Sequence, residues 1–217
     1  MSFDISHILK DWDADPDAKY IRKIIGIDGK EKIQIRVELG LLQMEADGRP
    51  DGKKPYGKES LLEHYISLLE NYRKEYETEE GFKLDHHDCE RLREESLQYY
   101  HRYISLFEIE DYRRVERDTA RNLRVFDILR RYAENQDDSL SLEKYRPYVI
   151  MMNTRARALS MSGRKNYAEA IDILEEAIEE ITNFYIDQEF GEDEIAQSQE
   201  LEVLKATIKE IHDKWEG

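Results

Sequence analysis

The feature that most constrains the fold is a helical period in the apolar residues, which starts near Tyr56 and continues to the end of the chain. Six stretches carry an apolar stripe at intervals of three and four residues, the spacing of one face of an α-helix. They are a helix over about Lys58–Glu77, two helices that begin after Asp85 and Asp111, and helices over about Leu142–Met161, Tyr167–Phe184 and Glu192–Lys214. Amphipathic helices with short connections predict a mainly α fold, an antiparallel array or bundle.

The residues before the helical region predict a small β-structure. Asp28-Gly29 lies between two apolar segments, Tyr20–Ile27 and Glu31–Glu38, and this dipeptide is a strong signal for a β-hairpin turn. Leu41–Glu45 is a candidate third strand, because a hairpin alone is only marginally stable. The first strand is apolar on both faces, so the pattern leaves its register open.

Other short segments flank this hairpin. Phe3–Trp12 predicts a short helical turn, Asp13–Asp17 predicts a break around Pro16, and Ala46–Pro55 predicts a loop. We therefore expect two parts, an N-terminal segment with the β-hairpin over residues 1–55 and an α-helical, repeat-like domain over residues 56–217.

The composition restricts the class of protein. The chain has 33 Lys and Arg against 49 Asp and Glu, a net charge of −16, and nucleic-acid phosphates repel such a polyanion at long range. No apolar run approaches the ~18 residues that span a bilayer, and residues 1–10 lack the layout of a signal peptide. The single Cys89 cannot form an internal disulfide. We expect a cytoplasmic protein that does not enter a membrane and for which nucleic acid is an unfavoured ligand.

The charge is also unevenly distributed along the chain. Residues 1–90 carry 14 basic and 21 acidic side chains, residues 91–165 carry 16 and 12, and residues 166–217 carry 3 and 16. An arginine-rich middle and a strongly acidic end allow pairing within the chain, with a charged partner, or with a second copy. A homo-oligomer would then form through the acidic C-terminal region.

A weak internal repeat indicates stacked helical hairpins. Asp111-Tyr112 and Asn166-Tyr167 lie 55 residues apart, and each pair stands at the start of a helix. An aromatic residue at the start of a second helix is typical of helix–turn–helix solenoids, in which each hairpin buries its apolar face against its neighbour.

The second copy of this repeat resembles a tetratricopeptide repeat in its small and aromatic residues, Ala158, Tyr167, Ala170 and Ala177. Leu174 replaces the usual aromatic residue, and Thr182 stands where proline is common. The resemblance implies a tetratricopeptide-like array of hairpins and a role in protein–protein contact.

A second resemblance overlaps the first. Asn166–Ile178 is similar to the short helical-hairpin motif shared by UvrB and UvrC of bacterial excision repair, without the Arg-Asp pair that usually follows its alanines. Lys32–Gly52 and Tyr145–Asn153 resemble an uncharacterised bacterial helical family that carries this UvrB/UvrC (UVR)-like motif. The resemblance implies a helical fold, a bacterial origin and protein–protein contact.

One tract concentrates potential metal ligands. In Asp85–Glu90, His86 on a helix would face the same way as Cys89 or Glu90, three and four residues on. Cys89, however, belongs to the apolar stripe, and no second pair of ligands at motif spacing occurs elsewhere. We interpret the tract as structural and expect no metal ion or other cofactor. The sequence leaves metal binding by His86, Cys89 and Glu90 open.

No motif in the sequence carries catalysis. Cys89 has no nucleophile signature around it, and adjacent carboxylates fall on polar helix faces. The glycines of residues 47–52 lack the spacing of a phosphate-binding loop. We expect a non-enzymatic protein without catalytic or cofactor-binding residues.

The strongest candidate for a binding surface is a row of arginines in the helix that follows Asp111. Their spacing places them on one face of that helix: Arg114, Arg117, Arg121, Arg124 and Arg131. Arginine suits bidentate contact with a carboxylate or a phosphate. The alternative interpretation is a solvated face that neighbouring acids neutralise.

These observations favour an adaptor or scaffold that binds an acidic or extended protein segment through the arginine row. A tyrosine-lined groove is an alternative site, which the sequence does not separate from a tyrosine-rich core. The alternative function is that of a DNA-repair-associated UvrB/UvrC-motif protein, which contacts a repair protein or nucleic-acid phosphates.

Overall fold

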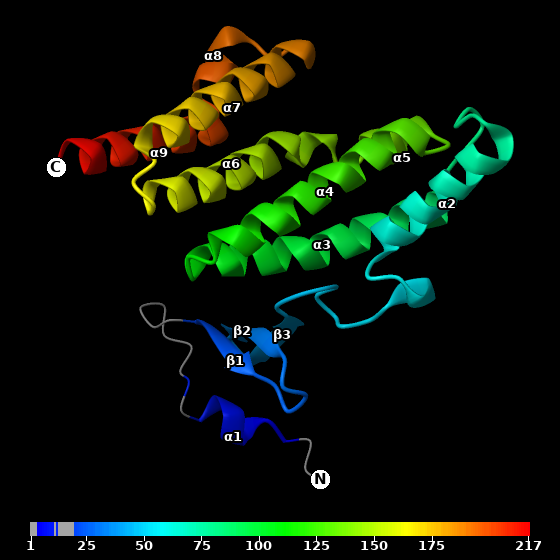
Figure 1. The fold of residues 1–217 in the computed structure, drawn as a ribbon, viewed down its shortest axis with the longest axis horizontal. Helices are drawn as coiled ribbons and strands as arrows, with labels where there is room; N and C mark the ends of the chain where they lie inside the picture. Colours follow the sequence, from blue (N-terminus) through cyan, green and yellow to red (C-terminus); the bar gives the residue numbers. More distant parts are fainter. Residues whose placement is uncertain (1–3, 11, 13–19) are drawn as a thin grey trace. The chain divides into compact units, whose positions relative to one another are not determined.

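The computed structural model describes residues 4–10, 12 and 20–217 of the chain. These residues are mostly helical, with a small three-stranded antiparallel sheet near the N-terminus (Figure 1). The predicted mainly α fold with an N-terminal β-hairpin is confirmed at this level. Each helix in the described part of the chain is too short or too polar to cross a membrane. The predicted break at Asp13–Asp17 lies outside the described residues.

The chain divides into two compact units that do not follow the predicted boundary at residue 55. The first unit holds Met1–Glu80 and Leu97–Glu110, and the second holds Gly81–Ser96 and Asp111–Gly217. Helix α3 (His86–Glu108) therefore contributes its first half to the second unit and its second half to the first. A small sheet needs a helical partner to be stable, which explains why the first unit extends beyond residue 55.

The sheet of the first unit has three antiparallel strands, β1 (Ile21–Ile25), β2 (Glu31–Val37) and β3 (Gly40–Glu45). The backbone N–H of Gly26 donates to the carbonyl oxygen of Lys30 at 2.8 Å and closes the first turn. Gly29 has a φ of +75°, which glycine adopts without strain. The hairpin and the third strand are both confirmed.

The strand register separates an apolar face from a polar face. Ile21 lies opposite Ile35 on β2, and the buried residues of this face are Ile21, Ile33 and Met44. On the other face, Gln34 accepts a hydrogen bond from Arg22 Nε and donates one to Gln43 Oε1, each at 2.8 Å. The register that the sequence left open is therefore set by one polar row across all three strands.

Helix α2 (Leu61–Tyr76) of the first unit buries one apolar stripe, whereas α1 (Ser6–Leu9) has no buried residue. Helix α1 gives the helical turn that the sequence predicts near the N-terminus. A 3₁₀ turn at Pro55–Gly57 precedes α2, whose N-terminus is capped by Ser60. Ser60 Oγ accepts from the backbone N–H of Glu63 at 3.2 Å. The buried residues of α2 are part of the predicted stripe: Leu61, Leu62, Tyr65 and Leu69.

A fully buried arginine holds the loop after β3. Arg102, in the second half of α3, donates to the carbonyl oxygens of Glu45 at 2.9 Å and Gly48 at 2.7 Å. Its guanidinium carbon lies 4.8 Å from the ring centroid of Tyr99. The carbonyl dipoles and the aromatic ring stabilise the buried charge, so Arg102 ties the loop to the helix.

The second unit is an array of helices around α6 (Arg146–Ser162). Helix α6 packs against α4 (Tyr112–Tyr132), α7 (Tyr167–Asp187) and α9 (Gln199–Glu216), and every residue of α6 is buried or half-buried. Figure 1 shows α6 between α4 and α7. Each region of this unit for which the sequence predicts a long helix contains one, with differences in where the helices begin and end.

The chain enters α6 differently from the prediction. The polar segment before it, residues 135–141, contains a short helix, α5 (Gln136–Leu140), because Asn135 Oδ1 accepts from the backbone N–H of Asp138 and caps it. A 3₁₀ turn at Glu143–Tyr145 follows, and α6 begins at Arg146 rather than at Leu142. Pro147 then lies in the first turn of α6, where its missing N–H removes no helical bond.

The C-terminal helices also depart from the prediction at one point. Helices α6 and α7 form a hairpin through the turn at residues 163–166, and the alanines of the predicted repeat are buried: Ala158, Ala170 and Ala177. The predicted helix over Glu192–Lys214 is two helices, α8 (Glu192–Ala196) and α9. Ser198 separates them, because its side chain accepts from the backbone N–H of Leu201 and caps α9.

Candidate functional site

Helix α4 is buried over almost half of its circumference, on a side that is partly polar. Its buried residues are Val115, Asp118, Thr119, Arg121, Asn122, Val125, Phe126, Leu129 and Tyr132. The polar members make hydrogen bonds inside the unit. Thr119 Oγ1, for example, accepts from Asn153 Nδ2 of α6 at 2.8 Å. A polar side chain on α4 is therefore not necessarily exposed to solvent.

Helix α4 has five exposed arginines besides the exposed acids Glu116 and Asp127, and four of the arginines share one narrow face. This face begins at Arg113 and spans about 80° of the helix circumference. Its residues are Arg113, Arg117, Ala120, Arg124, Asp127 and Arg131. We call the four basic members, Arg113, Arg117, Arg124 and Arg131, the arginine stripe. The stripe covers the exposed side of α4 over about 27 Å, at 1.5 Å per residue.

The arginine stripe differs from the predicted row in two members. Arg117, Arg124 and Arg131 lie on the exposed face. Arg121 does not, because it is 9% exposed and points into the second unit. Arg114 is half-buried, and its Nη1 lies 2.9 Å from Asp111 Oδ2. Arg113, which the predicted row lacked, takes a place on the exposed face.

A buried carboxylate explains the position of Arg121. Glu95, in the first half of α3, is fully buried, and Arg121 Nη2 forms an ion pair with its Oε1. Arg121 Nη1 also donates to Asn122 Oδ1 at 3.0 Å, and Asn122 Nδ2 donates to the carbonyl oxygen of Ser96 at 3.0 Å. A buried carboxylate requires a counter-charge, so Arg121 turns inward.

The sequence contains one signal that could have excluded Arg121. On a helical wheel, Arg121 lies about 80° from Arg113, whereas Arg124 lies about 20° from it. Asn122 is at about 180°, in the middle of the buried side. The predicted row is centred too close to this buried side, because it includes Arg114 and Arg121, which lie about 100° and 80° from Arg113.

Polar neighbours surround the arginine stripe. Arg117 Nε donates to the fully buried Asp118 at 2.9 Å, so Arg117 also has a structural role. Asp127, between two members of the stripe, lies 2.9 Å from Arg146 Nη2 of α6. The guanidinium of Arg131 lies 5.4 Å from the ring centroid of Tyr132. These contacts fix the base of the stripe on the unit.

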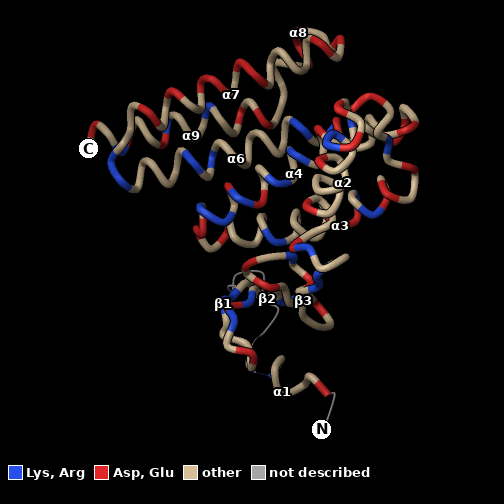
Figure 2. The backbone as a smooth tube through the Cα atoms, turned by 45° about the vertical axis from the view of Figure 1, so that its right-hand side comes forward, with Lys and Arg blue, Asp and Glu red and all other residues tan. Residues whose placement is uncertain are grey.

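Basic and acidic residues are segregated between the helices of the second unit. Helices α4 and α6 carry ten arginines and three acidic residues, whereas α7 carries seven acidic residues and no basic residue. Figure 2 shows Lys and Arg along α4 and α6 and Asp and Glu along α7. The uneven charge of the sequence therefore becomes a difference between separate helices of one unit.

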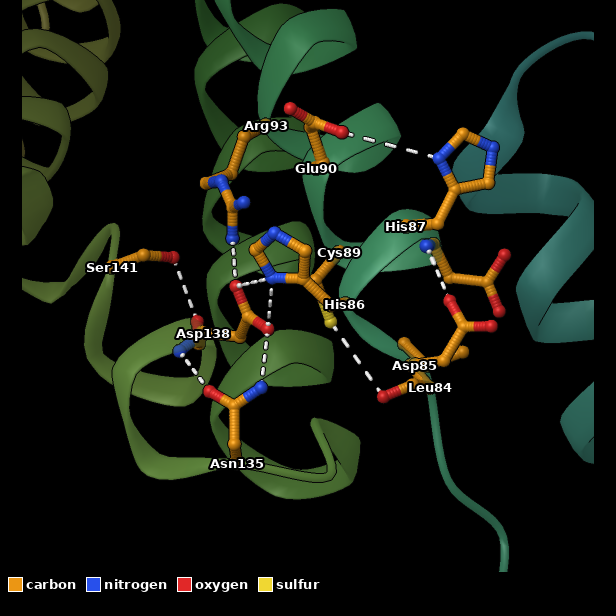
Figure 3. A network of polar contacts seen from close by, with 11 residues as sticks. Leu84, Asp85, His86, His87, Cys89, Glu90, Arg93, Asn135, Asp138 and Ser141 are labelled. Carbon is orange, nitrogen blue, oxygen red and sulfur yellow. Dashed lines mark hydrogen bonds and ion pairs between the residues drawn. The ribbon is translucent and has the colours of Figure 1, made fainter.

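The Asp85–Glu90 tract forms the N-terminus of α3, and its candidate ligands do not converge (Figure 3). His86 Nδ1 lies 2.9 Å from Asp138 Oδ2, and His87 Nδ1 lies 3.9 Å from Glu90 Oε2 on the surface. Asp85 Oδ1 accepts from the backbone N–H of Asp88 and caps the helix, as predicted. Among the described residues, no group of three or more His, Cys, Asp and Glu side chains could hold a metal ion.

Asp138 is the centre of this polar network. Its buried carboxylate accepts hydrogen bonds from Arg93 Nη1 at 2.5 Å and from Asn135 Nδ2 at 2.7 Å, besides its contact with His86. Burial alone would raise the pKa of Asp138, but these hydrogen bonds outweigh it and lower the pKa to about 2. The network joins α5 to the N-terminus of α3, which is a structural role.

Cys89 is a buried thiol. It is 0% exposed, and its Sγ lies 3.8 Å from the carbonyl oxygen of Leu84. Burial raises the pKa of Cys89 to about 11, and Asp138 adds to the shift, so the thiolate is disfavoured at neutral pH. A thiol in this state is a poor nucleophile and a poor metal ligand.

Comparisons of the chain with protein-family models, curated proteins and solved structures find no match. The similarities to tetratricopeptide repeats and to the UvrB/UvrC motif, with the bacterial origin that the latter implies, stay resemblances of the sequence. The cytoplasmic location and the absence of enzymatic activity stay predictions as well. Among the described residues, the arginine stripe is the strongest candidate for a binding surface.

Proposed function

We propose that this protein is a non-enzymatic adaptor or scaffold that binds an acidic or extended protein segment through the arginine stripe of α4. The observation that carries the proposal is the position of Arg113, Arg117, Arg124 and Arg131 on one exposed helix face. Guanidinium groups bind carboxylates in bidentate geometry, so a row of them favours a segment that carries several carboxylates in succession.

The shape of the second unit supports the same proposal. We also propose a tetratricopeptide-like arrangement for the hairpin of α6 and α7 with the following helix α9. It is supported by small buried residues, which allow two helices to approach closely. The smallest of these side chains belong to Ala156, Ala158, Ala170 and Ala177. Helix α4 packs on the same central helix, α6, and this fixed base holds the stripe in a straight row.

The expected affinity is modest. An exposed ion pair contributes about 0.2–1 kcal/mol, so four arginines supply about 1–4 kcal/mol together with any contacts beside them. The upper end of this range, about 4 kcal/mol, corresponds to a dissociation constant on the order of 1 mM. Binding should weaken strongly with added salt, because exposed charges are screened beyond about 8 Å at physiological ionic strength.

The test uses a defined probe. A fluorescein-labelled peptide rich in Glu, and the matched peptide with Gln in place of Glu, are titrated with the protein and followed by fluorescence anisotropy. We expect only the acidic peptide to bind. Binding should be lost in a triple variant that leaves Arg117 to hold Asp118: Arg113→Gln, Arg124→Gln and Arg131→Gln.

A matched control removes three exposed basic residues of the same unit elsewhere, Arg164→Gln, Lys165→Gln and Lys209→Gln. This control should bind the acidic peptide as the unmodified protein does. Equal loss in both variants, or no loss in the stripe variant, would contradict the proposal. A labelled DNA oligonucleotide that binds at about 150 mM salt, when the peptide does not, would favour the UvrB/UvrC-related alternative.

A further inference from the structure

We infer that the acidic segment bound by the arginine stripe is the outer face of α7 in a second copy of this chain. The inference rests on the proposed function, because it names the occupant of the same stripe. It follows from the opposite charges that one chain carries on two of its helices.

Helix α7 presents an acidic face that is densest over residues 169–180. Six exposed acids lie within about 100° of its circumference, and we call them the acidic stripe: Glu169, Asp172, Glu176, Glu179, Glu180 and Asp187. The opposite side of α7 is apolar and buried, with Ile171, Leu174 and Ile181. The acids therefore project outward as a row fixed by the packing of the helix.

The two stripes match in length and in chemistry. The arginine stripe extends from Arg113 to Arg131 and the acidic stripe from Glu169 to Asp187, so each covers about 27 Å of a straight helix. The exposed side chains of α4 sum to a charge of +3, and those of α7 sum to −7. Two helices of this kind can lie side by side with arginines facing carboxylates, except along residues 181–186 of α7, which carry no acid.

The two stripes of one copy cannot meet each other. Helix α6 packs against both α4 and α7 and lies between them (Figures 1 and 2). The contact must therefore join α4 of one copy to α7 of the next. In a dimer with such a head-to-tail contact, one copy still has an unoccupied arginine stripe and the other has an unoccupied acidic stripe. The assembly therefore either closes into a ring or adds further copies as the protein concentration rises.

The net charge of −16 does not prevent this contact at physiological salt. Repulsion between whole copies acts at long range, and it is screened beyond about 8 Å at 150 mM ionic strength. Paired side chains in contact are closer than this screening length. The attraction between the two stripes then outweighs the repulsion between the rest of the two chains.

Sedimentation velocity on charge-reversed variants at about 150 mM salt tests the inference. The arginine-reversed variant carries Arg113→Glu, Arg124→Glu and Arg131→Glu. The acid-reversed variant carries Asp172→Lys, Glu176→Lys and Glu179→Lys. The unmodified protein should show a sedimentation coefficient that rises between about 10 and 500 μM. Each variant alone should show no rise, and an equimolar mixture of the two should recover it.

The mixture isolates the stripe contact from non-specific attraction. Each substitution changes the charge by two units, so the net charge of −16 becomes −22 in the arginine-reversed variant and −10 in the acid-reversed variant. Both variants are therefore still acidic, and copies of them repel each other at long range. A control with the same charge change as the acid-reversed variant, Glu70→Lys, Glu94→Lys and Glu134→Lys, should associate like the unmodified protein. If a reversed variant fails to melt cooperatively, the three Gln substitutions at the same positions replace it and should also reduce association.

The outcomes separate this inference from the proposed function. An unmodified protein that stays monomeric up to about 500 μM, or a mixture that stays monomeric, overturns the inference. The proposed function then still stands if the acidic peptide binds to the arginine stripe. If the same variants lose both peptide binding and association, the result supports the proposed function and this inference. If the stripe substitutions change neither peptide binding nor association, both the proposed function and this inference are overturned.

Discussion

Replacing Arg121 by alanine distinguishes a structural arginine from the arginines of the stripe. Glu95 is fully buried, and the side chain of Arg121 is only 10% exposed in its ion pair with Glu95. Removing the arginine takes away the charge that donates directly to this carboxylate. The loss of one partner of a buried pair costs about 3–5 kcal/mol. The matched variant Arg124→Ala changes an exposed side chain of the same helix and should cost about 0.5 kcal/mol or less.

Urea unfolding and thermal melting, both followed by far-ultraviolet circular dichroism, measure the two variants. For a chain of this length, a loss of 1 kcal/mol lowers Tm by about 2–4 °C. We therefore expect Arg121→Ala to melt about 6–20 °C below the unmodified protein and Arg124→Ala to melt close to it.

A double variant tests the pairing itself. Arg121→Met combined with Glu95→Leu replaces the ion pair by apolar side chains of similar size, and it should recover most of the lost stability. Arg121→Ala and Arg124→Ala with equal stability would refute the reasoning, because Arg121 would then belong to the solvent face.

Two further predictions concern the network at the N-terminus of α3. Asp138 has a pKa of about 2 in the folded chain and 3.8 as its ordinary value, so its contribution is complete above about pH 4 and is lost as the pH falls towards 2. This contribution to the free energy of unfolding is about 2 kcal/mol. In the Asp138→Asn variant, the loss of stability between about pH 4 and pH 2 should therefore be smaller than in the unmodified protein. An equal loss of stability in the two proteins would contradict this prediction. Cys89, whose pKa is raised to about 11 by burial, should react with a thiol reagent at pH 8 far more slowly in the native protein than in urea. Equal rates in the two states would show that the thiol is accessible.

Local sequence signals predicted most of the elements. Asp28-Gly29 located the hairpin because its turn requires a positive φ, and Gly29 has one. Asp85 located the start of α3 because its carboxylate caps the first turn. Asn135 and Ser198 cap α5 and α9 by the same chemistry, and weighing these two caps would have found both helices.

The candidate site was harder to predict, because it depends on which polar residues are buried. Hydrophobic periodicity assigns polar side chains to solvent, so Arg121 joined the predicted row and Arg113 was missed. The position of Arg121 depends on Glu95, twenty-six residues earlier, which also resembles a surface residue in the sequence. When two charged side chains form a buried ion pair, the spacing of the apolar residues in either helix does not show that these side chains are buried.

The burial of α6 has a consequence for the order in which the chain becomes stable. This helix has no exposed residue, and its cover comes from α4, which precedes it, and from α7 and α9, which follow it. A nascent chain that ends before Tyr167 therefore presents bare valine, isoleucine and methionine side chains of α6 to water. Such a truncated product should aggregate or be degraded, whereas a chain that also contains α7 and α9 covers these side chains.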